Sequence, residues 1–148
     1  MAKQVIQSPD APAAIGPYSQ AILAGNTLYM SGQIPLDPRT MQLVDGIEAQ
    51  AHQVFSNLRA VAAAAGATLN DIVKLSILMA DLADFAKVND VMTGYFDAPY
   101  PARATYQVAG LPRGARIEVE ATLVVPQRAA SGDAQTGWRE AFDQKKGQ

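Results

Sequence analysis

The sequence predicts an α+β protein in which a mixed six-stranded sheet has two helices packed on one face. Three observations support this fold class. Strand and helix patterns follow one another as three strands, a helix, a strand, a helix and two strands. The first helix crosses between strands, which suits a mixed sheet with both helices on one side. The last strand alternates apolar and polar residues, so one sheet face is apolar and the other largely polar.

Composition narrows the class of function. The chain has 148 residues, 49% of them hydrophobic, which fits one globular domain. Its 12 basic and 14 acidic residues give a net charge of -2, so it lacks the positive field that attracts nucleic acid or anionic lipid. There is no cysteine and one histidine, His52, which disfavours thiol chemistry and a metal cluster. Without an apolar leader or a membrane-length apolar run, we expect a cytoplasmic protein.

The first part of the chain predicts three strands. Residues 3–7 read as an edge strand that ends at two prolines, and residues 15–22 turn at Gly-Pro before a second strand. Residues 28–31 follow closely enough to complete a hairpin. Small and polar residues close this strand at Gly32, where a backbone could approach a ligand. Gly32 could equally serve only the turn into Pro35.

A helix is predicted from residue 47 onward. Asp45 and Glu48 have the spacing of a capping box, apolar residues keep helical spacing up to Ala65, and Gly66 suits a C-terminal cap. Residues 71–80 then read as a strand.

A second helix is predicted to begin at Asp81 or Asp84 and to end before Pro99. Asn89 lies on or beside its apolar stripe. Its amide is either a structural hydrogen-bonding group or a group directed at a site near the sheet edge.

The last two strands place charged residues in segments that otherwise resemble core strands. Alternation puts Arg103 on one face of its strand, with Ala104 and Tyr106 on the opposite face, which we expect to be the apolar, helix-covered one. Glu118 and Glu120 share a face of the final strand. A charge in such a segment costs free energy unless it is paired or used.

Two uses of these charges are open. Arginine suits a two-point grip on a carboxylate, and Glu120 in the same cleft could transfer a proton and orient a water. The alternative is an internal salt bridge between Arg103 and a strand glutamate.

Five separated motifs resemble the reactive intermediate deaminase family, RidA type, also written YjgF/YER057c/UK114. They are Ile15–Ala21, Ser31–Pro35, Gly66–Lys74, Pro101–Arg103 and Ile117–Ala121. The resemblance covers residues 1–126, which we expect to be one RidA/YjgF-like domain. Residues 127–148 extend beyond it as a short helix or a disordered segment.

The resemblance implies a chorismate-mutase-like fold and a homotrimer with sites between subunits. It implies hydrolysis of 2-aminoacrylate, 2-iminopropanoate and 2-iminobutanoate to 2-keto acids and ammonia without metal or organic cofactor. Arg103 matches the carboxylate-binding arginine and Glu120 the glutamate near the attacking water. The positions that match the pocket lining are Tyr18, Ser31, Gly32 and Asn89, and Thr105 stands where many members have cysteine.

Two other functions are weighed against imine hydrolysis. The same cleft in a trimer could bind small carboxylates for regulation without turnover. Endoribonuclease or translation-inhibitor activity, which has been ascribed to family members, is disfavoured by the acidic balance of the chain.

Overall fold

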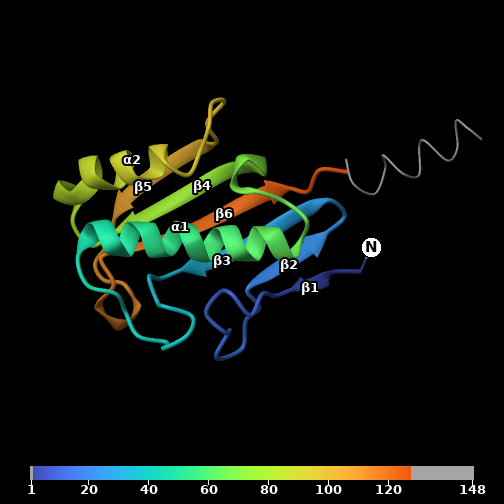
Figure 1. The fold of residues 1–148 in the computed structure, drawn as a ribbon, viewed down its shortest axis with the longest axis horizontal. Helices are drawn as coiled ribbons and strands as arrows, with labels where there is room; N and C mark the ends of the chain where they lie inside the picture. The colour runs from blue at the N-terminus through green and yellow to red at the C-terminus, as the bar shows by residue number, and fades with distance from the viewer. Residues whose placement is uncertain (1, 128–148) are drawn as a thin grey trace, which may run out of the picture.

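A mixed sheet of six strands forms one layer of the molecule, and two helices form the other (Figure 1). The computed structural model describes residues 2–127. The strands are β1 (Gln4–Ile6), β2 (Ala21–Ala24), β3 (Thr27–Gln33), β4 (Ile72–Met79), β5 (Ala102–Gln107) and β6 (Ile117–Val124). The helices are α1 (Ile47–Ala64) and α2 (Phe85–Thr93), and short 3₁₀ turns η1 (Leu69–Asp71), η2 (Leu82–Asp84) and η3 (Pro112–Gly114) join the larger elements. The fold class predicted from the sequence is confirmed.

The strand order is β1-β2-β3-β6-β4-β5. Only β4 and β5 pair in parallel, and α2 makes the crossover between them. All other described pairs are antiparallel. The last strand therefore lies at the centre of the sheet and β5 lies at its edge, beneath α2 (Figure 1).

The core lies between the helices and one face of the sheet. In α1, Val54, Phe55 and Leu58 are fully buried against apolar residues such as Leu28 and Leu123 of the strands. Burial of each large apolar side chain contributes roughly 1.5–3 kcal/mol. Within residues 2–127, neither helix has the length and apolar character needed to span a bilayer.

The second face of the sheet is open in the protomer. Along β6, Ile117, Val119 and Leu123 are fully buried, whereas Glu118 and Glu120 point to the opposite face. The alternation predicted for this strand is confirmed. No described element covers the open face, on which Tyr29 of β3 is 55% exposed.

The orientation predicted for β5 is wrong. Arg103 pairs with Leu75, a fully buried residue of β4, so Arg103 points to the helix side of the sheet. Tyr106 is instead 59% exposed on the open side. The edge position explains the reversal, because only the short α2 lies near this strand and a polar side chain on the helix side still reaches solvent. The internal salt bridge between Arg103 and a β6 glutamate is excluded, since the side chains lie on opposite faces.

The start of α1 also differs from the expectation. Asp45 and Glu48 form no capping box; the N-cap is Gly46, with φ 89° and no side-chain cap. A left-handed φ favours glycine at this position. The C-terminal expectation is confirmed, because Gly66 follows the last turn with φ 76°.

Candidate active site

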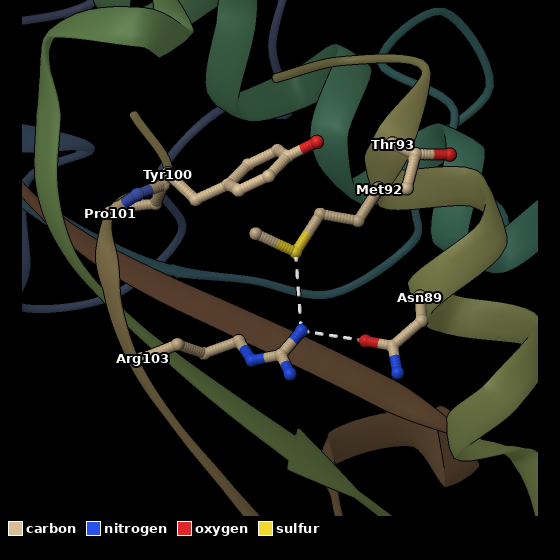
Figure 2. Close-up of a pocket in the computed structure, with 6 residues that line it drawn as sticks. All are labelled: Asn89, Met92, Thr93, Tyr100, Pro101 and Arg103. Carbon is tan, nitrogen blue, oxygen red and sulfur yellow. Dashed lines mark hydrogen bonds between the residues drawn. The ribbon is translucent and has the colours of Figure 1, made fainter. Parts of the chain in front are cut away.

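Arg103 is held against α2 from the edge strand. Its Nη1 donates to Asn89 Oδ1 at 2.6 Å and to Met92 Sδ at 3.6 Å (Figure 2). The central carbon of its guanidinium lies 5.2 Å from the centroid of the Phe85 ring. Within residues 2–127, no carboxylate lies within ion-pair distance of this arginine. The side chain is oriented, but its charge is not neutralised.

A cavity of about 470 Å³ adjoins the guanidinium. Its lining comes from α2, from β5 and from the two residues just before β5, namely Asn89, Met92, Thr93, Tyr100, Pro101 and Arg103 (Figure 2). Asn89 therefore does both things considered from the sequence: it makes a structural hydrogen bond, and it lies in a cavity at the sheet edge.

A second cavity, of about 580 Å³, lies around the end of β3. Tyr18, Gly32 and Glu118 all line it. A Cβ atom on Gly32 would lie 2.9 Å from Glu118 Cδ and 3.0 Å from Oε2, so glycine is what allows the carboxyl group to pack against β3. The pairing of β3 with β6 shifts register between Met30 and Gln33, as in a β-bulge.

The pKa of Glu118 is raised above its ordinary value. Burial is the larger cause, and the negative charge of Glu120 on the same face adds to it. A carboxyl group that retains its proton closer to neutral pH can both donate and accept one during a reaction.

The loop that positions Tyr18 is fastened by polar contacts. Ser31 Oγ donates to Ser19 O at 2.6 Å, so this hydroxyl supports the loop. Gln20 is buried; its Oε1 accepts from Ser8 N at 2.7 Å, and its Nε2 donates to Pro12 O at 2.8 Å. Tyr18 itself remains largely exposed beside the cavity.

Glu120 occupies a different place from Glu118. It lines a shallow hollow of about 230 Å³ with Tyr29, Lys74 and Ser76 on the open face of the sheet. It shares no cavity with Tyr18, Gly32 or Arg103.

Thr105 lies on the helix side of β5, two residues after Arg103. Its Oγ1 is the one buried side-chain polar atom in the described chain without a hydrogen-bond partner. Val108 N donates to Met79 O, and strand amides alternate in direction, so the Thr105 N–H points to the free edge of β5.

Comparison with known proteins gives this site a context. Residues 8–125 match the family described as endoribonuclease L-PSP. The chain belongs to the RidA/L-PSP family. It is 48% identical over 124 residues to the 2-iminobutanoate/2-iminopropanoate deaminase of Dermatophagoides farinae, which covers 83% of this chain and 97% of that protein. The family predicted from the motifs is therefore confirmed.

Two solved structures show the same RidA/L-PSP fold. RidA from an Antarctic Psychrobacter species is 52% identical with a TM-score of 0.81, over 82% of this chain and 99% of that one. Escherichia coli TdcF with bound serine is 39% identical with a TM-score of 0.80, over 83% and 99% of the two chains.

The structure divides the predicted site residues of this RidA/L-PSP chain into groups. Arg103, Asn89 and Thr105 belong to the α2–β5 edge, Tyr18 and Gly32 to the cavity at β3, and Glu120 to neither. Sequence reasoning missed Glu118 as a site residue. Its strand face was predicted, but only the packing of its carboxyl group against Gly32 distinguishes it from Glu120.

Proposed function

We propose that this chain hydrolyses 2-imino acids, 2-iminopropanoate and 2-iminobutanoate with their enamine tautomers, to 2-keto acids and ammonia. The observation that most supports this function is the placement of Arg103. Asn89 fixes its guanidinium beside a cavity, and no carboxylate of the described chain pairs with it. The similarity to proteins named 2-iminobutanoate/2-iminopropanoate deaminase gives the reaction class. Such imines have an electrophilic carbon, so the protein needs to hold the acid and deliver water.

Arg103 binds the substrate carboxylate in this proposal. Nη1 is engaged by Asn89 and Met92, which leaves Nε and Nη2 for a two-point contact. The Thr105 N–H at the free strand edge supplies a further donor. This gives Thr105 a role through its backbone that does not require the cysteine common in the family.

Glu118 is the proposed acid and base. It removes a proton from water as the water oxygen bonds to the imine carbon, and it passes this proton to the imine nitrogen, which gives an amino alcohol. The C–N bond of the amino alcohol then breaks as its hydroxyl proton is transferred through Glu118 to the leaving nitrogen, so that ammonia departs and the keto acid remains. Proton transfer of this kind is typically worth about 10²–10⁴-fold in rate, and the step uses no cofactor.

The role that the motif resemblance gave to Glu120 passes to Glu118. The raised pKa, the packing on Gly32 and the shared cavity with Tyr18 support Glu118. Glu120 instead lies in the hollow with Lys74 and Tyr29, away from Gly32 and Tyr18.

A complete site is proposed to form between two copies of the chain. Arg103 pairs with Leu75 and Glu118 with Leu78, on opposite faces and with β4 between their strands. Strand geometry separates their Cα atoms by roughly 10 Å along the sheet and roughly 10 Å across it. A small imino acid cannot contact both within one protomer, whereas Arg103 of one copy and Glu118 of another can meet in a homotrimer. The open face, with Tyr29 and Tyr106 exposed, supports assembly through this side of the sheet.

An in situ imine assay tests the activity. An amino-acid oxidase or a threonine dehydratase generates the imine, and its decay is followed with and without the protein. We expect wild type to accelerate the decay and Arg103→Ala to lose this acceleration, with Arg103→Lys as the charge-retaining comparison. Wild type no faster than Arg103→Ala contradicts the proposal.

Two outcomes would favour other functions. Carboxylate binding without faster imine decay would indicate a regulatory module. RNA cleavage that disappears in Arg103→Ala and Glu118→Gln would support the nuclease activity in the family description. The cytoplasmic location and the domain boundary at residue 126 stay predictions; the expected helix or disorder of the C-terminal extension falls on residues 128–148, which the structure does not describe.

A further inference from the structure

The cavity beside Arg103 is polar on one side and apolar on the other. Arg103 and Asn89 form the polar side, where the guanidinium and the amide meet (Figure 2). The ring of Tyr100 extends over the Met92 thioether, which lies between the ring and the guanidinium (Figure 2). A molecule with its carboxylate on Arg103 therefore has an apolar wall beside it.

The remaining lining strengthens this apolar character. Pro101 has no N–H to offer. Thr93 Oγ1 donates to Asp90 O at 2.6 Å, so its proton is already used within α2. In Figure 2 the Tyr100 hydroxyl lies at the far end of its ring from Pro101, on the side of Thr93, and away from the guanidinium.

The cavity is large for the smallest proposed substrates. Its volume is about 470 Å³ on the Arg103 side alone. A three-carbon imino acid occupies about four times the volume of a water molecule, which is roughly 30 Å³ in the liquid. Pockets of roughly 300–1,000 Å³ hold considerably larger ligands. Space remains for a longer side chain after the carboxylate is placed.

We infer that Tyr100 and Met92 form a side-chain subsite that selects 2-imino acids whose apolar side chain is longer than ethyl. This rests on the proposed imine hydrolysis and names its preferred substrate class. Tyr100 is 59% exposed in the protomer, so its ring is available to cover such a side chain. Met92 supplies a flexible, polarisable surface that adapts to chains of different shape.

The test compares imines of increasing side-chain length. A D-amino-acid oxidase generates them from D-alanine, D-norvaline, D-leucine and D-methionine, because the imine carbon is planar and the configuration of the parent is lost. For wild type we expect kcat/KM to be higher for the leucine and methionine imines than for the alanine imine. Each methylene in a fitting apolar pocket is worth about 10-fold or more.

Variants at Tyr100 assign the selectivity to the ring. Tyr100→Ala should lower the leucine-to-alanine ratio of kcat/KM about 10-fold or more, whereas Tyr100→Phe should retain the wild-type ratio. Val5→Ala is the control: it shortens a residue that is 56% exposed on β1, at the opposite end of the sheet. Thermal unfolding of each variant checks that the fold is retained.

The outcomes separate this inference from the proposed activity. If wild type accelerates no imine, the proposed function fails. If wild type hydrolyses the longer imines with a kcat/KM no higher than that for the alanine imine, or if Tyr100→Ala leaves the ratio unchanged, the subsite assignment alone is overturned.

Discussion

Glu118 and Glu120 lie two residues apart on the same face of β6, yet their surroundings differ. Glu118 packs on Gly32 and is half-buried, whereas Glu120 is exposed beside Lys74. Alternation in the sequence predicts their shared face but does not distinguish between them. The distinction comes from side-chain packing, because the Glu118 carboxyl group lies against Gly32 of β3, whereas Glu120 pairs with Ser76 of β4 beside Lys74.

Exchange of each glutamate for glutamine tests this distinction. Glu118→Gln removes the proposed acid and base and should slow imine hydrolysis about 10²–10⁴-fold. Glu120→Gln makes the same chemical change on the same strand face and should keep the rate within about threefold of wild type. The measurement is kcat/KM in the in situ imine assay. A larger loss in Glu120→Gln than in Glu118→Gln would return the catalytic role to Glu120.

The raised pKa of Glu118 predicts a pH-dependent stability difference. The pKa of a glutamate in the unfolded chain is about 4.3. Because the folded protein holds this proton to higher pH, it loses stability as pH rises from that value through the raised pKa. Glu118→Gln removes this loss and should therefore be more stable than wild type at neutral pH. The advantage should vanish below about pH 4.

Denaturant unfolding of both proteins at several pH values measures this difference. If the free energy of unfolding of Glu118→Gln exceeded that of wild type by the same amount at pH 3.5 and at pH 7, the prediction would be contradicted.

At the scale of elements, the end of β3 shapes the cavity that holds the proposed acid and base. The register shift between Met30 and Gln33 and the absence of a side chain at residue 32 allow β6 to bring its glutamate close to the β3 backbone. The sequence suggested a close backbone approach at Gly32, with a plain turn as the alternative. It did not show that the approaching group is Glu118.

Gly32→Ala tests this packing. The added methyl group would lie 2.9 Å from Glu118 Cδ, so the carboxyl group must move away. Because the displaced atoms are the end of a flexible side chain, we expect a stability loss near the lower end of the roughly 1–3 kcal/mol that overpacking costs and a loss of kcat/KM of at least about 10-fold. Gly110→Ala is the control, since no atom lies within 4 Å of its added Cβ. Unchanged kcat/KM in Gly32→Ala would show that the position of Glu118 is not critical.

Most elements were predictable because their periodicity reflects burial in the protomer. The stripe of Val54, Phe55 and Leu58 and the alternation in β6 both describe contacts with a single core. Strand β5 was not predictable in the same way. Its burial pattern is weak at the sheet edge, and a side chain that points toward the helices is the charged Arg103.

At the scale of the whole molecule, the proposed site is divided into two halves within one protomer. The α2–β5 edge supplies a fixed cation, and the β3–β6 cavity supplies a carboxyl group with a raised pKa, on the other face of the sheet. The motif resemblance grouped Arg103 with Glu120 and implied sites between subunits, but it did not identify Glu118 as the carboxyl group of the β3–β6 cavity. In a homotrimer each interface can join the two halves, so three copies give three complete sites.

Light scattering gives the first test of this assembly. We expect the mass of a trimer at micromolar concentration, because the open sheet face then becomes an interface. A monomer mass at the concentration at which the protein is fully active would contradict a site shared between subunits.

The most direct test mixes two inactive variants. Arg103→Ala keeps Glu118, and Glu118→Gln keeps Arg103, so each homotrimer lacks one half of every site. Co-expression of both variants in equal amounts should restore about one quarter of wild-type imine deaminase activity per subunit, the share of interfaces that combine both native residues by random assembly. Mixed trimers with no more activity than the separate variants would contradict a site that joins Arg103 of one subunit to Glu118 of the next.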